Sequence, residues 1–393
     1  MSKNISDQFA NPLFNNIQQN TFLKEYWQQK SYVFRDALTE NVNDIVRVVD
    51  GNELAGLACE EEVESRIIFG HGRTEEWRCE QGVFNENRFA SLPDENWTLL
   101  VQGLDQWFEE VRELFHYFDF LPQWRLEDIM ASYAPKGGGV GPHFDYYDVF
   151  LIQVSGSREW KLGQQCDEQS ELQNNDQVKL LQDFLTEETH DLIAGDILYV
   201  PAGKAHWGTA NTDDCITFSV GFRAPSEKEL VTQLLENIIE KCADNLRYQD
   251  PVSDSGHHPA KMTDAAYKQV NQLLQQLTQE KLQQAAQQSF GELVTEPRYF
   301  LSDDCMEELS EQDFHFQVNQ ITKKSSVIPI FIPVSTRLAF SAAGLFVNGE
   351  CYVVSELFAE SVCDGEIAAE NMSESEKLVL ITLLELGDVS LLK

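Results

Sequence analysis

The stretch from residue 128 to residue 222 alternates short apolar segments with glycine- and proline-containing turns, and no helical pattern interrupts it. The apolar run 149–154 ends at the turn cluster 155–157, and another short run lies between Gly195 and Pro201. Apolar runs of roughly four to eight residues between turn residues are typical of buried strands. Many such strands without helices between them predict a β-barrel or a double-sheet jelly roll.

Patterning outside this stretch predicts more than one domain. At 393 residues the chain is longer than a single core usually organises. A short strand is expected at 31–34, and helical spacing of apolar residues predicts helices at 53–58 and 97–108. We assign residues 1–225 to one domain, a double-stranded β-helix of the jelly-roll or cupin type.

A helical composition marks the region 226–293. Ser226 and Glu229 form a capping box before an amphipathic helix. After a polar break at 250–259, a second helical stretch at 260–293 carries its own apolar seam. Because both seams must be buried, we predict that this region joins two protomers into a homodimer.

The last segment, 294–393, combines a β-hairpin signal with a helix. The hairpin signal is the Asn-Gly pair at 348–349, and Ser373 with Glu376 caps the helix. This combination predicts a small winged-helix-like α+β domain. Residues 301–393 carry five Lys or Arg against sixteen Asp or Glu, so direct contact with nucleic-acid phosphates is disfavoured.

The whole chain is strongly acidic. It has 29 Lys and Arg against 65 Asp and Glu, a net charge of -36. Such a field repels nucleic acid and attracts basic surfaces, so a basic protein partner is one interpretation. A solvated acidic surface that serves solubility is the other.

Cysteine usage and hydropathy bear on the compartment. The eight cysteines form no Cys-x-x-Cys pair, which favours reduced thiols. The N-terminus lacks the pattern of a secretory leader, and no apolar run approaches the roughly 18 residues of a membrane span. We expect a cytoplasmic protein.

A candidate metal site begins at His143 and Asp145, two positions apart and just before the run 149–154. If the strand begins near His143, both side chains point to one face. Among the eight histidines only this one has a carboxylate two positions later. A lone histidine of this kind is more often a core residue, but a second, His206, ends a Pro-x-Gly-x-x-His turn. Two histidines and one carboxylate are the ligand set of non-haem iron(II) sites.

Arg158 adds an anion-binding prediction. It follows the turn at 155–157, on the strand that returns into the barrel. An arginine inside an apolar barrel requires an anion, and its planar fork matches a carboxylate. The alternative is an arginine at the rim of the barrel that pairs with a nearby Asp or Glu.

Together these motifs resemble the JmjC/cupin-type 2-oxoglutarate-dependent oxygenases. Four stretches, 53–58, 135–150, 195–201 and 219–225, are similar to the bacterial ribosomal oxygenases. That family hydroxylates an arginine of the sixteenth large-subunit ribosomal protein, so the resemblance implies a basic ribosomal protein as substrate. It also implies that the other two regions serve dimerisation and a winged-helix domain.

The resemblance implies a cofactor and a co-substrate. Fe(II) would be held by His143, Asp145 and His206, and 2-oxoglutarate would chelate it. Arg158 would pair with the far carboxylate of 2-oxoglutarate. Oxidative decarboxylation to succinate would then drive hydroxylation of a C–H bond.

Further contacts follow from the same resemblance. Ser132 and Thr217 are expected to help bind the co-substrate, and Tyr147 and Asp148 to contact the substrate, although core or rim packing would equally explain the latter two. Two alternatives remain for the function. One is another JmjC activity, histidyl hydroxylation or lysyl demethylation, and the other is a non-catalytic metal-binding cupin that acts as an interaction module.

Overall fold

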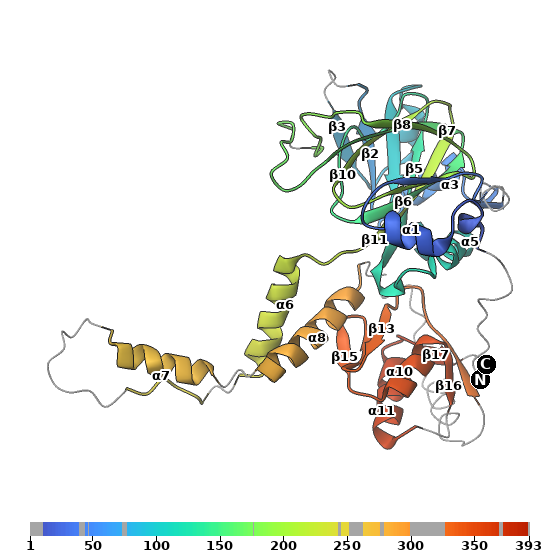
Figure 1. Cartoon of the computed structure of the whole chain (residues 1–393). Helices are drawn as coiled ribbons and strands as arrows, with labels where there is room; N and C mark the ends of the chain where they lie inside the picture. The colour runs from blue at the N-terminus through green and yellow to red at the C-terminus, as the bar shows by residue number, and fades with distance from the viewer. Residues whose placement is uncertain are drawn as a thin grey trace. The chain divides into compact units, whose positions relative to one another are not determined.

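The structure is a computed structural model, shown in Figure 1. It describes residues 11–38, 44–45, 47–72, 77–175, 177–242, 245–250, 262–275, 279–298, 327–368 and 372–391. The chain divides into two compact units, Met1–Ala224 and Pro225–Lys393, and each is considered by itself. The polar break predicted at 250–259 lies, apart from Asp250, outside the described residues.

An eight-stranded antiparallel sheet forms the body of the first unit. Its strands lie in the order β1-β9-β6-β11-β5-β4-β2-β3. They are β1 (Tyr32–Phe34), β2 (Ser65–Phe69), β3 (Arg78–Gln81), β4 (Trp97–Val101), β5 (Leu126–Ala134), β6 (Asp148–Ser155), β9 (Ile197–Val200) and β11 (Cys215–Phe222).

A second, three-stranded sheet packs against the first. It has the order β10-β7-β8, with β7 at Ser157–Gln165, β8 at Glu188–Ile193 and β10 at Lys204–Ala210. Buried side chains of both sheets, such as Leu151 of β6 and Leu162 of β7, belong to one apolar cluster between them. Two sheets closed over a shared core are a double-stranded β-helix, and the predicted jelly roll is confirmed.

A larger aromatic core lies on the other face of the eight-stranded sheet. Phe150 of β6 points to this face, and its ring centroid is 4.8 Å from that of Phe118. The short helices that supply this core or flank it are η2 (Pro12–Phe14), α1 (Gln19–Glu25), α3 (Gly51–Leu57), α4 (Glu86–Ala90), η3 (Leu104–Gln106), α5 (Glu109–Arg112), η4 (Glu113–Phe118) and η5 (Gln123–Arg125). Because alternate residues of β6 enter two cores, the strand is held from both sides.

One helix prediction is wrong. Residues 97–108 form strand β4 and the 3-10 helix η3 instead of one helix. All five residues of β4 are buried, and β4 lies between β2 and β5. A strand covered on both faces has a continuous apolar run without alternation, and such a run is hard to distinguish from a buried helix.

The second unit contains helices and two small sheets. Its helices are α6 (Glu227–Glu240), α7 (Asp264–Leu274), α8 (Gln279–Thr295), α10 (Glu356–Cys363) and α11 (Glu374–Glu385). Its strands are β12 (Val327–Phe331), β13 (Leu338–Ser341), β14 (Gly344–Val347), β15 (Glu350–Tyr352), β16 (Glu366–Ala368) and β17 (Ser390–Leu391). The predicted capping boxes at Ser226 and Ser373 are present, and Asn348 and Gly349 turn the β14–β15 hairpin with φ of 50° and 88°.

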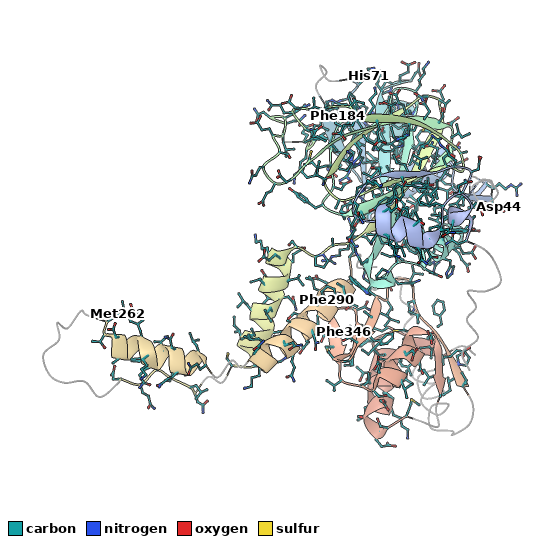
Figure 2. The ribbon with its side chains drawn as sticks, in the orientation of Figure 1. Asp44, His71, Phe184, Met262, Phe290 and Phe346 are labelled. Atoms are coloured by element: carbon teal, nitrogen blue, oxygen red, sulfur yellow. The ribbon has the colours of Figure 1, made fainter. Side chains whose placement is uncertain are left out.

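Helix α8 connects the helical part of this unit to its sheet. Asn237 of α6 donates hydrogen bonds to Ser289 and Glu292 of α8, at 2.8 and 2.7 Å. Farther along, a side chain at Gly291 would meet the ring of Phe346, at 2.3 Å from its nearest atom, so the glycine lets β14 approach α8. Figure 2 labels Phe346 and Phe290, the residue before this glycine. Within the described residues, no helix is long and apolar enough to cross a membrane.

Candidate metal centre

Two histidines lie opposite each other on a short backbone bridge. The amide of His143 donates to the carbonyl of His206 at 3.1 Å, and the amide of His206 donates to that of His143 at 2.8 Å. The ring centroids are 4.2 Å apart. His206 lies in β10, whereas His143 forms an isolated bridge in the segment before β6. The condition of a strand that begins near His143 is therefore not met.

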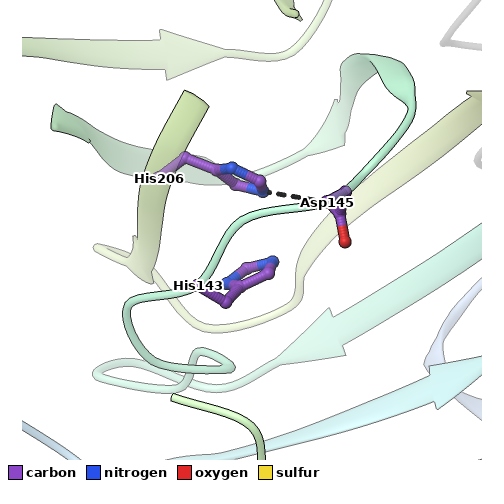
Figure 3. Close-up of side chains that lie close together, drawn as sticks. All are labelled: His143, Asp145 and His206. Atoms are coloured by element: carbon purple, nitrogen blue, oxygen red, sulfur yellow. Dashed lines mark ion pairs between the residues drawn. The ribbon is translucent and has the colours of Figure 1, made fainter. Parts of the chain in front are cut away.

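Asp145 completes the group. One ligand atom from each of Asp145, His143 and His206 lies within 4.8 Å of the others. Asp145 Oδ2 is 3.5 Å from His206 Nε2, the pair joined by the dashed line in Figure 3. The amide of Gly203 donates to the carbonyl of Asp145 at 2.7 Å, so the Pro-x-Gly-x-x-His turn holds the Asp145 backbone as well as placing His206.

Both imidazoles present Nε2 to the centre of this group. Nδ1 of His143 is 2.9 Å from the carbonyl of Gly141, and Nδ1 of His206 is 3.0 Å from that of Lys204. A carbonyl only accepts, so Nδ1 carries the proton and Nε2 keeps its lone pair. Burial, together with His143, lowers the pKa of His206 to about 4, so its imidazole is neutral at pH 7. This donor set fits a divalent transition metal.

The glycine-rich loop before His143 makes the close approach possible. A side chain at Gly139 would lie 2.3 Å from the Gly208 carbonyl of β10, and one at Gly138 would lie 2.1 Å from the Trp97 carbonyl. Gly141 has φ of +80°, which favours glycine. The loop therefore packs its backbone closely against β4 and β10.

Arg158 lies inside the barrel. Its side chain is on the inward face of β7 and only 2% of the residue is exposed. Its Nε and Nη2 atoms have no hydrogen-bond partner among the described residues. The rim alternative, an arginine paired with a local acid, does not describe this position. A buried guanidinium with free donors is a site for an anion.

Ser132 and Thr217 belong to one polar row across the large sheet. Thr217 of β11 is paired with Ser132 of β5 on one side and with Gln153 of β6 on the other. The Thr217 hydroxyl donates to Gln153 Oε1 at 2.9 Å, and the Ser132 hydroxyl lies 3.4 Å from the Thr217 carbonyl. Gln153 is two residues from Leu151, so the row faces the interior that Arg158 enters. A role of this row in co-substrate binding stays a prediction.

Gln153 is a residue that sequence reasoning missed. It is fully buried, and besides accepting from Thr217 it donates to the carbonyls of Ser155 and Ile216 at 2.7 and 3.3 Å. Its signal in the sequence is a single amide within the apolar run 149–154. From the sequence alone, one amide in an apolar strand gives no sign of a functional role. Its hydrogen-bond partners become known only when the neighbouring strands are placed.

The two predicted substrate contacts differ in position. Tyr147 is 39% exposed and lies against Gly221 at the rim, so its substrate role stays a prediction. Asp148 is fully buried, accepts from Arg125 at 3.0 Å and from the Tyr199 hydroxyl at 2.7 Å, and cannot reach a substrate. The prediction for Asp148 is wrong because this carboxylate points into the outer core. There, burial and the nearby charge of Asp148 raise the pKa of the Tyr199 hydroxyl.

Known proteins share this architecture. Residues 113–230 match the family model of the JmjC domain. A ribosomal protein uL16 3-hydroxylase from Escherichia coli is 34% identical over 282 residues, which cover 71% of this chain and 72% of the relative. The chain belongs to the JmjC-type ribosomal oxygenases.

Two further proteins that are similar to this ribosomal oxygenase support the same family assignment. A probable ribosomal oxygenase from Haemophilus influenzae is 37% identical over 266 residues, which are 64% of this chain and 62% of that protein. A solved ribosomal oxygenase from Escherichia coli, in complex with cobalt and 2-oxoglutarate, matches with a TM-score of 0.75 and 26% identity, covering 96% of this chain and 99% of that one. The predicted family and enzyme class, a 2-oxoglutarate-dependent oxygenase of the JmjC type, are confirmed.

The cofactor set of the JmjC oxygenases fits the residues of this site. Iron(II) and 2-oxoglutarate are the cofactor and co-substrate of the family, and the cobalt of the solved relative is an iron substitute. Two imidazoles and a carboxylate suit the metal, and the Arg158 donors that lack partners among the described residues suit a carboxylate of the co-substrate.

Proposed function

We propose that this chain is an Fe(II)- and 2-oxoglutarate-dependent protein hydroxylase that acts on an arginine of ribosomal protein uL16. His143, Asp145 and His206 would hold the metal, and Arg158 would pair with the far carboxylate of 2-oxoglutarate. The observation that carries the proposal is the buried guanidinium of Arg158, whose Nε and Nη2 lack hydrogen-bond partners among the described residues, in the same barrel as the three potential ligands. An apolar barrel that buries such a charge needs a ligand to compensate it.

The protein's own residues would bind and orient the reactants. When bound, iron(II) and 2-oxoglutarate would supply the oxidising chemistry: one oxygen atom of O2 would enter the substrate and the other succinate, with release of CO2. The Gly141 and Lys204 carbonyls hold the imidazoles with Nε2 directed inward. The apolar cluster of Leu151, Trp160 and Leu192 keeps water away from the anion that Arg158 binds.

The substrate proposal rests on the Escherichia coli relative and on charge. The name of that relative specifies uL16 and a 3-hydroxylation. A basic ribosomal protein would be attracted to a chain with a net charge of -36, whereas free nucleic acid would be repelled. Exposed Tyr147, at the rim, would contact the substrate. Action on a ribosomal protein is consistent with a cytoplasmic location.

We propose the homodimer and the domain roles on the pattern of exposed side chains. Helix α6 exposes Val231, Leu235 and Ile239 at four-residue spacing, 46, 52 and 67% respectively. One apolar stripe on a polar helix is typical of a surface that a partner helix covers. The region 226–293 would then supply the dimer interface, and residues 294–393 a winged-helix-like domain that faces protein partners.

An intact-mass experiment tests the function. The purified chain with iron(II), 2-oxoglutarate and oxygen should add one oxygen atom to uL16, and fragment mass spectra should place it on an arginine. His206→Ala should abolish the reaction, whereas His116→Ala, at a largely exposed histidine outside the site, should not. Oxygen on a histidine, or loss of a methyl group from a lysine, would support another JmjC activity. No mass gain from a metal-loaded chain would support the non-catalytic interaction module.

A further inference from the structure

Trp160 carries a buried indole N–H without a partner. The residue is 4% exposed, and its Nε1 has no hydrogen bond among the described residues. Two other buried tryptophans do donate, Trp77 to the carbonyl of Gly72 at 3.2 Å and Trp97 to that of Pro93 at 2.7 Å. Because buried indole N–H groups normally have a partner, the exception at Trp160 requires an explanation.

The indole lies close both to the predicted anion site and to one of the metal ligands. Trp160 and Arg158 are two residues apart on β7, so both point into the barrel. The centroid of the Trp160 ring is 5.8 Å from the guanidinium carbon of Arg158 and 5.9 Å from the centroid of the His206 ring. A molecule that reaches from the metal to Arg158 therefore passes this indole.

The position of the ring is set by the protein. Trp160 of β7 is paired with Gly208 of β10, and a side chain at Gly208 would come within 2.8 Å of the indole. The glycine thus leaves the space that the ring fills. On its other side the ring packs in the cluster that contains Leu151 and Leu162. A side chain held in this way loses little freedom when a ligand binds, which favours a positioning role.

The polar groups of this interior leave donors in excess. Within the described part of the chain, Nε and Nη2 of Arg158 and Nε1 of Trp160 are donors without acceptors. The nearby oxygen Oε1 of Gln153 already accepts from Thr217. An ionised carboxylate only accepts, and it offers about four lone-pair sites.

We propose that the Trp160 indole N–H donates a hydrogen bond to the 2-oxoglutarate carboxylate that Arg158 pairs with, and so orients the co-substrate. This proposal rests on the proposed function. Arg158 supplies the charge, and the indole supplies a third, directional donor. Trp160 is therefore a positioning residue.

The first measurement follows the indole itself. In the full chain loaded with zinc, the ¹H–¹⁵N indole resonance that disappears in Trp160→Phe identifies Trp160. Addition of 2-oxoglutarate should move this resonance downfield, as expected for an N–H that gains a charged acceptor. An unchanged resonance in a protein that binds 2-oxoglutarate would overturn the proposal.

The second measurement compares matched variants. Trp160→Phe keeps an aromatic ring but loses the donor, and should bind 2-oxoglutarate about 10-fold more weakly by titration calorimetry. The control Trp207→Phe changes a half-buried tryptophan of β10 that packs on Phe184, which Figure 2 labels, and should bind like the wild type. Equal affinity in Trp160→Phe and wild type would remove the role of Trp160 while the proposed function stands. Failure of the wild type to bind 2-oxoglutarate would overturn both.

Discussion

Two buried arginines on opposite sides of the large sheet differ in how they are satisfied. Arg125, 8% exposed, donates to Asp148 at 3.0 Å and to the carbonyls of Arg223 and Phe222 at 2.9 and 3.3 Å. Arg158, 2% exposed, leaves Nε and Nη2 without partners within the described part of the chain. Burial carries a desolvation free energy for both charges, but among the described residues only that of Arg125 is offset by an ion pair inside the protein.

The contrast separates a stabilising ion pair from a binding site. Arg125 and Asp148, with the Tyr199 hydroxyl, belong to the outer aromatic core and connect η5 to β6. Arg158 occupies the interior between the two sheets, where a bound anion can complete its hydrogen bonds. Substitution of the two arginines should therefore affect different properties.

The largest effect on ligand binding and turnover is expected at Arg158. Arg158→Ala should weaken 2-oxoglutarate binding by about 100-fold or more and abolish turnover, because a desolvated charge pair is lost. Binding is measured by calorimetry and turnover by succinate release. Arg158→Lys keeps the charge but loses the planar fork, so its loss should be smaller. If Arg158→Ala kept wild-type affinity, the anion site would be elsewhere.

The second effect is expected at Arg125. Arg125→Ala should lower the free energy of unfolding by about 3–5 kcal/mol, because it leaves the Asp148 carboxylate buried and uncompensated. Urea unfolding measures this, and 2-oxoglutarate affinity of the folded protein should change little. The control Arg47→Ala breaks the exposed pair with Asp44 and should cost less than about 1 kcal/mol. Equal costs for the two substitutions would contradict the role assigned to Arg125.

A third effect links the ligand to stability. Zinc-loaded wild-type protein should gain about 2.7 kcal/mol in unfolding free energy at a 2-oxoglutarate concentration 100 times its dissociation constant. At the same concentration Arg158→Ala should gain almost nothing, whereas Arg47→Ala should gain as much as the wild type. Chemical unfolding with and without 2-oxoglutarate measures the difference. A full gain in Arg158→Ala would show that the ligand binds without this guanidinium.

The smallest effect extends the comparison to the second unit, where Glu376 is a buried charge that is fully satisfied. Desolvation would raise its pKa, but hydrogen bonds from Ser355 and Ser373 outweigh that and lower it from 4.5 to about 2. A lowered pKa adds stability above pH 4.5, and this stability is lost as the pH falls through about 2.

Glu376→Gln should therefore lower the free energy of unfolding by about 1 kcal/mol at pH 7. It should also remove the loss of stability at acidic pH that arises from this carboxylate. Hydrogen exchange of the α10 and α11 amides in the full chain measures it. Glu374→Gln, at the exposed first helical residue, is the control and should change little. An acid profile that Glu376→Gln leaves unchanged would assign the dependence to other carboxylates.

Local signals in the sequence predicted much of the fold. Short apolar runs between turn residues predicted β6 and β9, the turn at 155–157 predicted the returning strand β7, and the capping boxes at Ser226 and Ser373 predicted the starts of α6 and α11. These signals act over a few residues, so they are visible without tertiary contacts. The doubly covered strand β4 was misread, because its neighbours in the sheet determine its burial.

At the site, ligand types and their order were readable, and contacts were not. His143, Asp145, His206 and Arg158 were singled out by residue type and spacing, and the structure places the first three within 4.8 Å of one another. Asp148 was misassigned because one residue of register decides between the rim and the outer core.

Residue types and their spacing were enough to predict the chemistry that the chain offers, which is two imidazoles, one carboxylate and an arginine on a jelly roll. Which polar groups satisfy one another depends on tertiary contacts. These contacts pair Arg125 with Asp148 and Gln153 with Thr217, and within the described residues they leave Arg158 and Trp160 with unused donors in the interior. Hydrogen bonds between strands far apart in the chain depend on register and on the face of the sheet, and neither is written in local sequence.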